Sequence, residues 1–285
     1  MPETTVTVEP LEGAVGCVIH GLRSDRPLSE ADFAAIERAM FDHIAIVIPD
    51  LDEDVPWLRD LGRRFGPLVP HALDQYHHPA TSEISIIARN DGTAQSRTTG
   101  KPAGAFWHSD LSYDRAPSDA IFLYAQKVPS RGGDTMVCNM AAAYEALEAG
   151  MKARLAGLTA THRWGFNTAG ATPMMTPEQK AKHPDVVHPV VRVHPRSGRE
   201  VLYVNPGYTV RINELPEDEG AALLEALYAQ SLQPQFTYRH GWQKGMLLGL
   251  DNRSSMHAAV DDYTEPRRML RMIVGCADGD IGRVA

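Results

Sequence analysis

The decisive stretch of this 285-residue sequence is Phe106-Trp107-His108-Ser109-Asp110-Leu111-Ser112-Tyr113. Its aromatic residues favour a strand, and His108 and Asp110 are separated by a single residue. Alternate side chains of a strand point to the same face of the sheet. The imidazole and the carboxylate are therefore expected to project together into one cavity.

Such a pair of side chains suits a divalent metal ion. Two histidines and one carboxylate form the facial ligand set of non-haem Fe(II) oxygenases. We expect the second histidine to be His257, in the segment Asp251-Asn252-Arg253-Ser254-Ser255-Met256-His257. A His-x-Asp pair alone is more often a hydrogen-bonded pair in the core or at the surface, so the interpretation depends on the motifs that accompany it.

Composition places the chain among ordinary soluble globular proteins. Hydrophobic residues make up 43% and charged residues 22%, and the length allows a substantial core. No change of composition marks a linker, so we expect one domain over residues 1–285. The net charge of −8 leaves no broad basic surface for nucleic acid or anionic lipid.

The sequence also predicts where the protein works. The N-terminal residues are acidic, and no apolar run approaches membrane-spanning length, so neither a signal peptide nor a membrane segment is expected. The three cysteines, Cys17, Cys138 and Cys276, are far apart and form no C-x-x-C pair. A disulfide framework is therefore not expected, and the reducing cytoplasm is the predicted compartment.

Periodicity and turn signals predict a mainly β protein with flanking helices. Helices are expected after the capping residues Ser29 and Asn139, up to Gly66, and from Pro216. A β-rich core of this kind closes into a sandwich or barrel, and its inward face is a natural metal pocket. Strands are expected within residues 4–20, 44–48, 84–87, 121–125, 190–193, 201–204, 246–248 and 269–275.

Two long irregular segments interrupt this pattern. One lies near residues 71–104 and includes a polar, glycine-bearing loop that leads directly to His108. The other lies near residues 165–188 and contains several prolines. Long loops beside active sites often close over them, so both are candidate lids, although a plain surface loop explains the first equally well.

Four motifs occur in a fixed order along the chain. They are Trp107-His108-Ser109-Asp110, Gly132-Gly133-Asp134-Thr135, the segment from Asp251 to His257, and Pro266-Arg267-Arg268. Together they resemble the taurine dioxygenase and 2,4-dichlorophenoxyacetate dioxygenase (TauD/TfdA) family of Fe(II)/2-oxoglutarate-dependent enzymes. The resemblance extends from Phe65-Gly66 to Gly275. Each motif is loose by itself, whereas the ordered set is specific.

The resemblance implies a double-stranded β-helix, that is, a cupin-like jelly roll. It implies Fe(II) bound by His108, Asp110 and His257, with 2-oxoglutarate and O2 as cosubstrates. Thr135 and Arg268 would bind the far carboxylate of 2-oxoglutarate, which suits the planar fork of an arginine. If Arg268 does not, Arg267 or Arg271 is the next choice.

The implied reaction hydroxylates an unactivated carbon of a small organic molecule and releases succinate and CO2. An Ala or Gly in place of Asp110 would open a halide site, as in related halogenases, so Asp110 favours hydroxylation. His71 lies where the family often places a substrate-contacting histidine, and Tyr76 and Trp107 are candidate pocket residues. Relatives are commonly dimers or larger, so we expect a homo-oligomer.

The charge of the substrate depends on one departure from the family. Well-known members carry a second arginine four residues after the one that binds 2-oxoglutarate, and it holds an anionic substrate. Counted from Arg268, that position is Met272, and Arg271 would face the other side of the strand. We therefore predict a neutral or apolar substrate, or one anchored by His71 or Arg211. If a bulge aims Arg271 into the pocket, a small sulfonate or aryloxy carboxylate is expected.

Two other classes of protein fit the same ligand set. A zinc hydrolase would use the three ligands with a water molecule in the open position. No obvious glutamate base lies beside the ligands, which disfavours that class. A non-catalytic jelly-roll binding protein would not need an intact ligand set.

Overall fold

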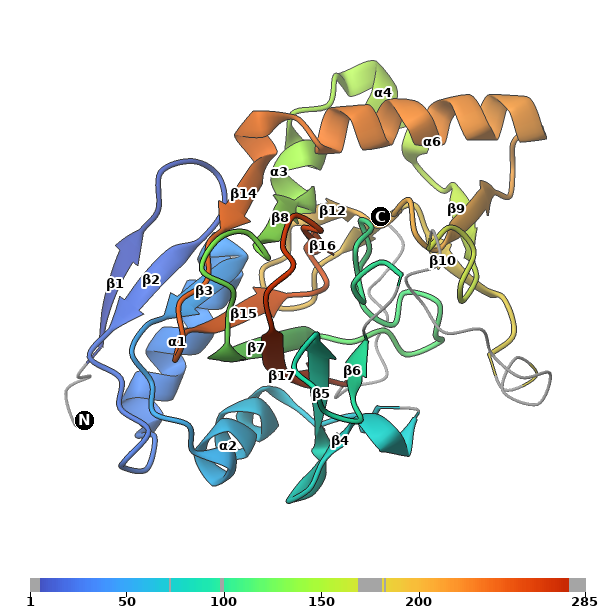
Figure 1. The fold of residues 1–285 in the computed structure, drawn as a ribbon. Coiled ribbons are helices and arrows are strands. Elements are labelled where there is room, and N and C mark those ends of the chain that lie inside the picture. Colours follow the sequence, from blue (N-terminus) through green and yellow to red (C-terminus); the bar gives the residue numbers. More distant parts are fainter. Residues whose placement is uncertain (1–5, 72, 98–99, 169–180, 182, 277–285) are drawn as a thin grey trace.

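The computed structural model describes residues 6–71, 73–97, 100–168, 181 and 183–276. A nine-stranded sheet forms the centre of the molecule (Figure 1). Its neighbouring strands are antiparallel except at the β2–β3 and β5–β6 pairs, which are parallel. Across the sheet the strands are β1 (Thr7–Pro10), β2 (Cys17–His20), β3 (Ala45–Ile48), β15 (Leu247–Asp251), β7 (Ala120–Lys127), β17 (Arg267–Val274), β5 (Thr81–Arg89) and β4 (His77–His78), with β6 (Ser96–Arg97) paired to β5.

A second sheet is the partner of the large one in the core. It has three antiparallel strands in the order β14 (Thr237–His240), β8 (Thr135–Asn139) and β16 (Ser255–Ala259). Val137 of β8 packs with Leu123 of β7, Leu248 of β15 and Met269 of β17 in one buried cluster. The inner faces of the two sheets therefore share a core, as in a β-sandwich.

Helices cover the outer face of each sheet. Helices α1 (Glu30–His43) and α2 (Val55–Phe65) pack against the large sheet, whereas α3 (Met140–Glu145) and α6 (Glu217–Ser231) pack against the small one. The second group, with α4 (Ala149–Leu155), gathers along the top of Figure 1, away from α1 and α2. The prediction of a mainly β fold with flanking helices is confirmed.

The predicted capping residues explain where two of these helices begin. The Ser29 hydroxyl accepts a hydrogen bond from the backbone N–H of Asp32 (3.1 Å). The Asn139 side chain accepts one from the N–H of Ala142 (2.9 Å). Each cap satisfies a donor that the first helical turn leaves free. None of the helices in the described part of the chain has the length and apolar character needed to span a bilayer.

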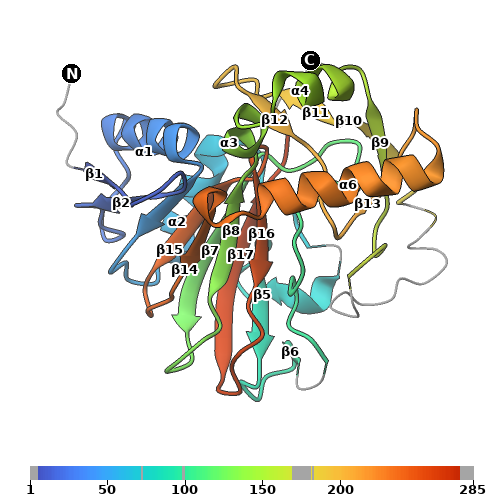
Figure 2. The ribbon, with the colours of Figure 1, turned by 90° about the horizontal axis from the view of Figure 1, so that it is seen from above.

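Two small sheets complete the fold beside the sandwich. One contains β10 (Val186–Pro189), β9 (Thr159–His162) and β13 (Thr209–Ile212), and the other pairs β11 (Val191–Val193) with β12 (Glu200–Leu202). The hairpin predicted around Ser197-Gly198 is the β11–β12 pair. Two 3-10 helices lie at Asp74–Tyr76 and Pro234–Phe236. In Figure 2, β9 to β12 lie on one side of the central strands, and α1 lies on the other.

Strand β17 presents different side chains to the two sides of the large sheet. Met269 and Ile273 belong to the core between the two sheets. Leu270, Met272 and Val274 belong to the core beneath α1 and α2. Since the faces of a strand alternate, Arg267 and Arg271 share the inner face with Met269 and Ile273. This alternation decides which arginines reach the site.

Candidate active site

Residues 106–113 do not form the strand that their composition favours. Only His108 pairs with a neighbour, through an isolated bridge to His257 with backbone N–H···O distances of 3.0 and 2.8 Å. The chain turns immediately afterwards, with the N–H of Ser112 bonded to the carbonyl of Ser109 and Leu111 at φ 57°. The expected strand is wrong here because these local bonds replace a sheet ladder.

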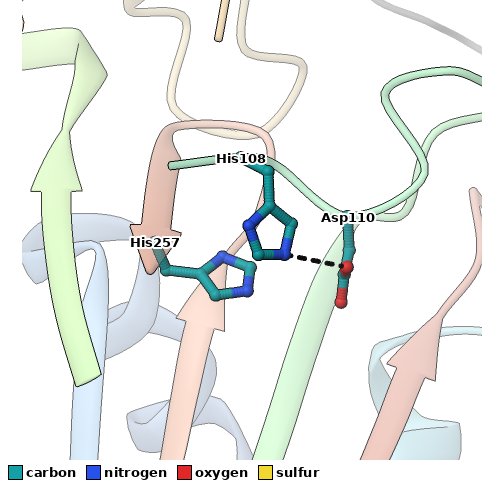
Figure 3. Close-up of side chains that lie close together, drawn as sticks. All are labelled: His108, Asp110 and His257. Atoms are coloured by element: carbon teal, nitrogen blue, oxygen red, sulfur yellow. Dashed lines mark ion pairs between the residues drawn. The ribbon is translucent and has the colours of Figure 1, made fainter. Parts of the chain in front are cut away.

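The turn nevertheless brings the three predicted ligands together (Figure 3). One ligand atom from each of His108, Asp110 and His257 lies within 4.8 Å of the others. His108 Nε2 is 3.5 Å from Asp110 Oδ1, and the two imidazole ring centroids are 4.2 Å apart. All three side chains are buried. A compact group of two imidazoles and one carboxylate is an arrangement able to hold a divalent cation.

Hydrogen bonds leave the ligand atoms available. His108 Nδ1 lies 2.7 Å from the carbonyl of Phe106, so this nitrogen is assigned as the donor and Nε2 keeps its lone pair toward the site. Among the described residues, Asp110 Oδ2 and His257 Nδ1 are buried without a hydrogen-bond partner. Asp110 Oδ2 has only an ion-pair contact with Arg271 Nη1 at 3.5 Å. Buried polar atoms are rarely left without a hydrogen-bond partner, so these two atoms indicate a site for a bound ion.

Local electrostatics set the protonation that a metal requires. Burial acts to raise the pKa of the Asp110 carboxyl, but Arg271 and the two imidazoles outweigh it, and the pKa lies well below its usual range. Burial and the neighbouring His108 lower the pKa of His257 to about 3. An ionised carboxylate and a neutral imidazole are the forms that bind metal ions.

The turn that carries Asp110 is fixed by side chains from the loop before β16. The Asn252 amide accepts a hydrogen bond from the N–H of Asp110 (2.9 Å) and donates one to its carbonyl (2.9 Å). The Ser109 hydroxyl donates to the carbonyl of Ser255 (2.7 Å). At Gly104, with φ 73°, a Cβ atom would lie 3.1 Å from His108 Cε1, so a side chain there would crowd the ligand.

A cavity of about 650 Å³ extends from the ligands. All three candidate ligands line it, together with Thr135, Arg267 and Arg271. Most of its other walls are apolar or aromatic. The aromatic side chains that line it are Phe106, Tyr113, Trp164, Tyr208 and Tyr76, beside the imidazole of His183.

Arg268 does not line this cavity, contrary to the sequence prediction. Its guanidinium bonds to Gln126 (3.1 Å) and Asp91 (2.9 Å) on the other face of β17. Arg267 lines the cavity instead, and its side chain is buried. Adjacent residues of a strand point to opposite faces of the sheet, so only one of two neighbouring arginines can reach the site.

Arg271 also lines the cavity, and its Nη1 lies 3.5 Å from Asp110 Oδ2. Arg271 and Arg268 lie on opposite faces of β17, as predicted, but Arg268, from which the substrate position was counted, does not line the cavity. Arg267 and Arg271 are four residues apart on one face, which is the family's spacing. The preference for a neutral substrate therefore loses its basis. No bulge in β17 is required to bring Arg271 to the cavity.

The other three tentative substrate residues differ in position. His71 and Tyr76 line the cavity, and their rings are 4.9 Å apart. Burial and the nearby Arg271 lower the pKa of His71 to about 4. Trp107 does not line the cavity but packs against the core beneath α3 and α6. Its carbonyl accepts a hydrogen bond from the N–H of Gly207 (3.1 Å), so it supports the His108 segment from behind.

Both candidate lids border the cavity. Gln95 lines it from the first segment and His183 from the second. Residues 98–99, 169–180 and 182, which also belong to these segments, lie outside the described residues. Closure over the site stays a prediction for both.

Sequence reasoning offered Arg267 only as an alternative to Arg268, and it missed part of the aromatic wall. The spacing from Arg267 to Arg271 was the available signal for Arg267. Tyr113 packs edge-on against Trp164 and Tyr208, with centroid distances of 4.5 and 4.8 Å. Trp164 and Tyr208 belong to parts of the chain far from the ligand motifs, and no local pattern relates them.

Two facing sheets with a buried His–Asp–His set beside a cavity define the class of jelly-roll dioxygenases that use a non-haem metal. Residues 7–273 match the family described as "Taurine catabolism dioxygenase TauD, TfdA family", and the chain belongs to this family. The protein is accordingly a 2-oxoglutarate-dependent dioxygenase, an oxidoreductase, as predicted. Membership in this family sets aside the zinc hydrolase and the non-catalytic binding protein.

Proteins with similar sequences match the chain over almost their whole length. The chain is 30% identical to pentalenolactone F synthase from Streptomyces arenae, covering 96% of this chain and 97% of the relative. It is also 30% identical to the α-ketoglutarate-dependent 2,4-dichlorophenoxyacetate dioxygenase of Cupriavidus pinatubonensis, covering 94% and 96%.

Solved structures give the same result for the fold. A taurine dioxygenase from Burkholderia xenovorans superposes with a TM-score of 0.81 at 29% identity, covering 98% of this chain and 93% of the other. AAD-2, solved in complex with Mn(II) and N-oxalylglycine, gives a TM-score of 0.82 at 26% identity, covering 96% and 98%. The predicted jelly-roll fold is confirmed.

Proposed function

We propose that this dioxygenase uses Fe(II) to hydroxylate an unactivated carbon of a small organic anion. The observation that carries the proposal is a shared surface: the buried ligand set lines the same cavity as two arginines four residues apart on β17. One arginine would bind the cosubstrate 2-oxoglutarate, and the other would bind the anionic substrate.

His108, Asp110 and His257 would hold the iron. The fit is supported by Asp110 Oδ2 and His257 Nδ1, which are buried without a hydrogen bond among the described residues, and by a mixed nitrogen and oxygen donor set that suits Fe(II). A bound Fe(II) ion would supply the redox chemistry for using O2, by which 2-oxoglutarate becomes succinate and CO2. One oxygen atom of O2 enters succinate and the other enters the new hydroxyl group, so the reaction balances.

Arg267 would bind the far carboxylate of 2-oxoglutarate, with Thr135 beside it. Arg267 is 5% exposed, and its Nε is buried without a hydrogen-bond partner among the described residues; Tyr263 and, from beyond ion-pair distance, Asp134 act on its charge. A buried guanidinium without an acidic partner is unfavourable and gains from a bound carboxylate. The Thr135 hydroxyl accepts a hydrogen bond from Trp242 Nε1 (3.1 Å), which leaves its own proton free to donate to the ligand.

Arg271 would hold the anionic group of the substrate, with His71 and Tyr76 nearby. Two relatives act on molecules of this kind: the 2,4-dichlorophenoxyacetate dioxygenase named above, and an α-ketoglutarate-dependent sulfate ester dioxygenase of Pseudomonas putida that is 27% identical to this chain. The apolar and aromatic walls would accept the rest of the substrate. An aryloxy carboxylate fits this combination best, and a small sulfonate or sulfate ester is the alternative.

The protein's own contribution is placement and exclusion of water. Arg267 and Arg271 would fix two anions at a defined distance along one rigid strand, which aligns the substrate carbon with the metal. The aromatic wall keeps water away from the reacting atoms. We also infer that the enzyme is cytoplasmic, because its three cysteines are free. We infer a homo-oligomer because members of the family are commonly dimers or larger.

The test is substrate-dependent release of succinate under 18O2. The panel pairs aryloxy acids, alkyl sulfonates and alkyl sulfates with the neutral methyl ester or amide of each acid. We expect an anionic member to be hydroxylated with one 18O and one succinate per product. Turnover of the neutral partners at equal or higher kcat/KM would contradict the assignment of Arg271.

A further inference from the structure

A second group of buried polar side chains lies outside the active site. His162 ends β9, His188 lies in β10, Arg192 lies in β11, and Tyr203 follows β12 (Figure 2). Their relative exposures are 0%, 1%, 2% and 3%. The Arg192 guanidinium lies 4.2 Å from the centroid of the Tyr203 ring, and the His162 ring stacks on the same tyrosine at 5.8 Å. The four side chains therefore form one cluster.

This cluster contains an unusual number of polar atoms without partners. Among the described residues, hydrogen-bond partners are lacking for Arg192 Nε and Nη1, the Tyr203 hydroxyl, both ring nitrogens of His162, and His188 Nδ1. Buried polar atoms in native proteins are nearly always paired with protein, water or an ion. Arg192 and Tyr203, His162 and the Tyr203 backbone, and His188 and the Ser112 backbone interact with each other, but none of these contacts is a well-formed hydrogen bond, so the cluster keeps donors available for a bound group.

The charge of the cluster indicates what kind of group it is. Tyr203 lies within the electrostatic influence of Arg192, Arg253 and Asp119. Arg253 is paired with Asp119, with Nε 2.6 Å from Oδ1. Within the described part of the chain, Arg192 has no carboxylate at ion-pair distance. The carboxylate of Asp114 also acts on the cluster through His188, but its side chain is 40% exposed. The buried charge of Arg192 therefore has no close, buried compensating partner, which is costly.

The available donors point to an anion, and not only to water. Arg192 offers two N–H groups, and the Tyr203 hydroxyl and one nitrogen of His162 can each offer one. His188 Nε2 lies 2.9 Å from the carbonyl of Asp114, so its N–H is assigned to that bond and its Nδ1 is an acceptor. We propose that the cluster binds one small monovalent anion, such as chloride, through Arg192, Tyr203 and His162.

The anion would be structural. It ties β9 and the β11–β12 hairpin together around one buried charge. His188 connects this cluster to Asp114, which lies four residues after the candidate ligand Asp110. The site is distinct from the cavity, because none of its four side chains lines that cavity.

The first test is the halide dependence of thermal stability. The full-length protein is melted at pH 7.5 in potassium gluconate, with chloride or bromide replacing gluconate at constant ionic strength. A bound anion stabilises the native state by mass action, so Tm should rise saturably by about 2–5 °C between zero and 200 mM halide. An equal Tm in gluconate and halide would overturn the proposal.

Two variants assign the effect to this cluster. Arg192→Gln removes the buried charge and should abolish the halide-dependent rise in Tm. Arg211→Gln, at an exposed position on the neighbouring strand β13, should retain it. If both variants keep the halide effect, the anion binds elsewhere and the proposal is wrong.

Crystallography of the wild-type protein gives an answer that does not depend on folding of Arg192→Gln. Crystals grown in bromide should show an anomalous peak within hydrogen-bond distance of Arg192 and Tyr203. Water density alone at this position, in bromide well above the midpoint of the Tm titration, would overturn the assignment.

Discussion

The Asn252 side chain holds both backbone polar groups of Asp110, at 2.9 Å each. The same amide nitrogen donates to the carbonyl (3.0 Å) and the hydroxyl (2.7 Å) of Ser118. Asn252 lies in the loop that precedes β16, the strand that carries His257. The carboxylate ligand, which lies in an irregular turn, is thereby attached to the segment that positions a histidine ligand.

Replacing Asn252 by Leu should weaken metal binding by about 10–100-fold, the usual effect of losing a group that orients a ligand. The dissociation constant for Mn(II) is measured by calorimetry on variants shown to be folded by circular dichroism. Ser118→Ala removes one partner of the amide and the bond from the Ser118 hydroxyl to the Asp110 carbonyl (3.1 Å), but it keeps both bonds between Asn252 and Asp110, so it should change the constant less. Equal constants for Asn252→Leu and the wild type would show that Asn252 does not position Asp110.

Arg267→Ala should raise the KM for 2-oxoglutarate at least about tenfold, since a hydrogen bond to a charged group contributes about 1.5–3 kcal/mol. Arg268→Ala is the matched control, one residue away on the opposite face, and should leave this KM nearly unchanged. The measurement is succinate formation against 2-oxoglutarate concentration at saturating Fe(II) and substrate. The reverse ranking of the two variants would restore Arg268 as the anchor.

Arg271→Ala should lower kcat/KM for the anionic substrate by about tenfold or more, by loss of a charged hydrogen bond. The KM for 2-oxoglutarate should stay within a factor of about two to three. Arg271→Lys keeps the charge but not the fork, and should recover part of the loss. A selective loss of 2-oxoglutarate binding in Arg271→Ala would exchange the proposed roles of the two arginines.

The stability of the fold should fall with acidification because of buried neutral histidines such as His240. Burial lowers the pKa of His240 to about 4. The unfolded chain therefore takes up this proton first, and the contribution of His240 to stability is lost as the pH falls from about 6.5 toward 4.

The corresponding variant is His240→Gln. Between pH 7 and 5 its free energy of unfolding should decrease by about 2 kcal/mol less than that of the wild type. Urea titrations at pH 7, 6 and 5 give both slopes under the same conditions. Identical pH dependence of the two proteins would mean that His240 is not held neutral by the fold.

Local rules in the sequence predicted most of the architecture. Ser29 and Asn139 cap the expected helices because capping depends on neighbouring residues alone. The three candidate ligands converge although the strand predicted around His108 and Asp110 does not form. A bridge followed by a turn directs these two side chains to one point as well as a strand would.

Features that depend on which face of a strand is inward could not be predicted locally. Both faces of β17 are buried, one by α1 and α2 and the other by the second sheet. Hydrophobic alternation therefore gave no signal for choosing Arg267 over Arg268. The aromatic wall of Tyr113, Trp164 and Tyr208 likewise arises from tertiary contacts between distant segments.

The most direct test of the central claim is anaerobic absorption spectroscopy with Fe(II) and 2-oxoglutarate. The wild-type protein should develop a weak visible charge-transfer band that requires both additions and saturates at one Fe(II) per chain. His257→Ala should not develop the band, whereas Arg268→Ala should develop it at the same concentrations of 2-oxoglutarate as the wild-type protein. Absence of the band in wild-type protein that demonstrably binds both Fe(II) and 2-oxoglutarate would contradict the proposed iron and cosubstrate site.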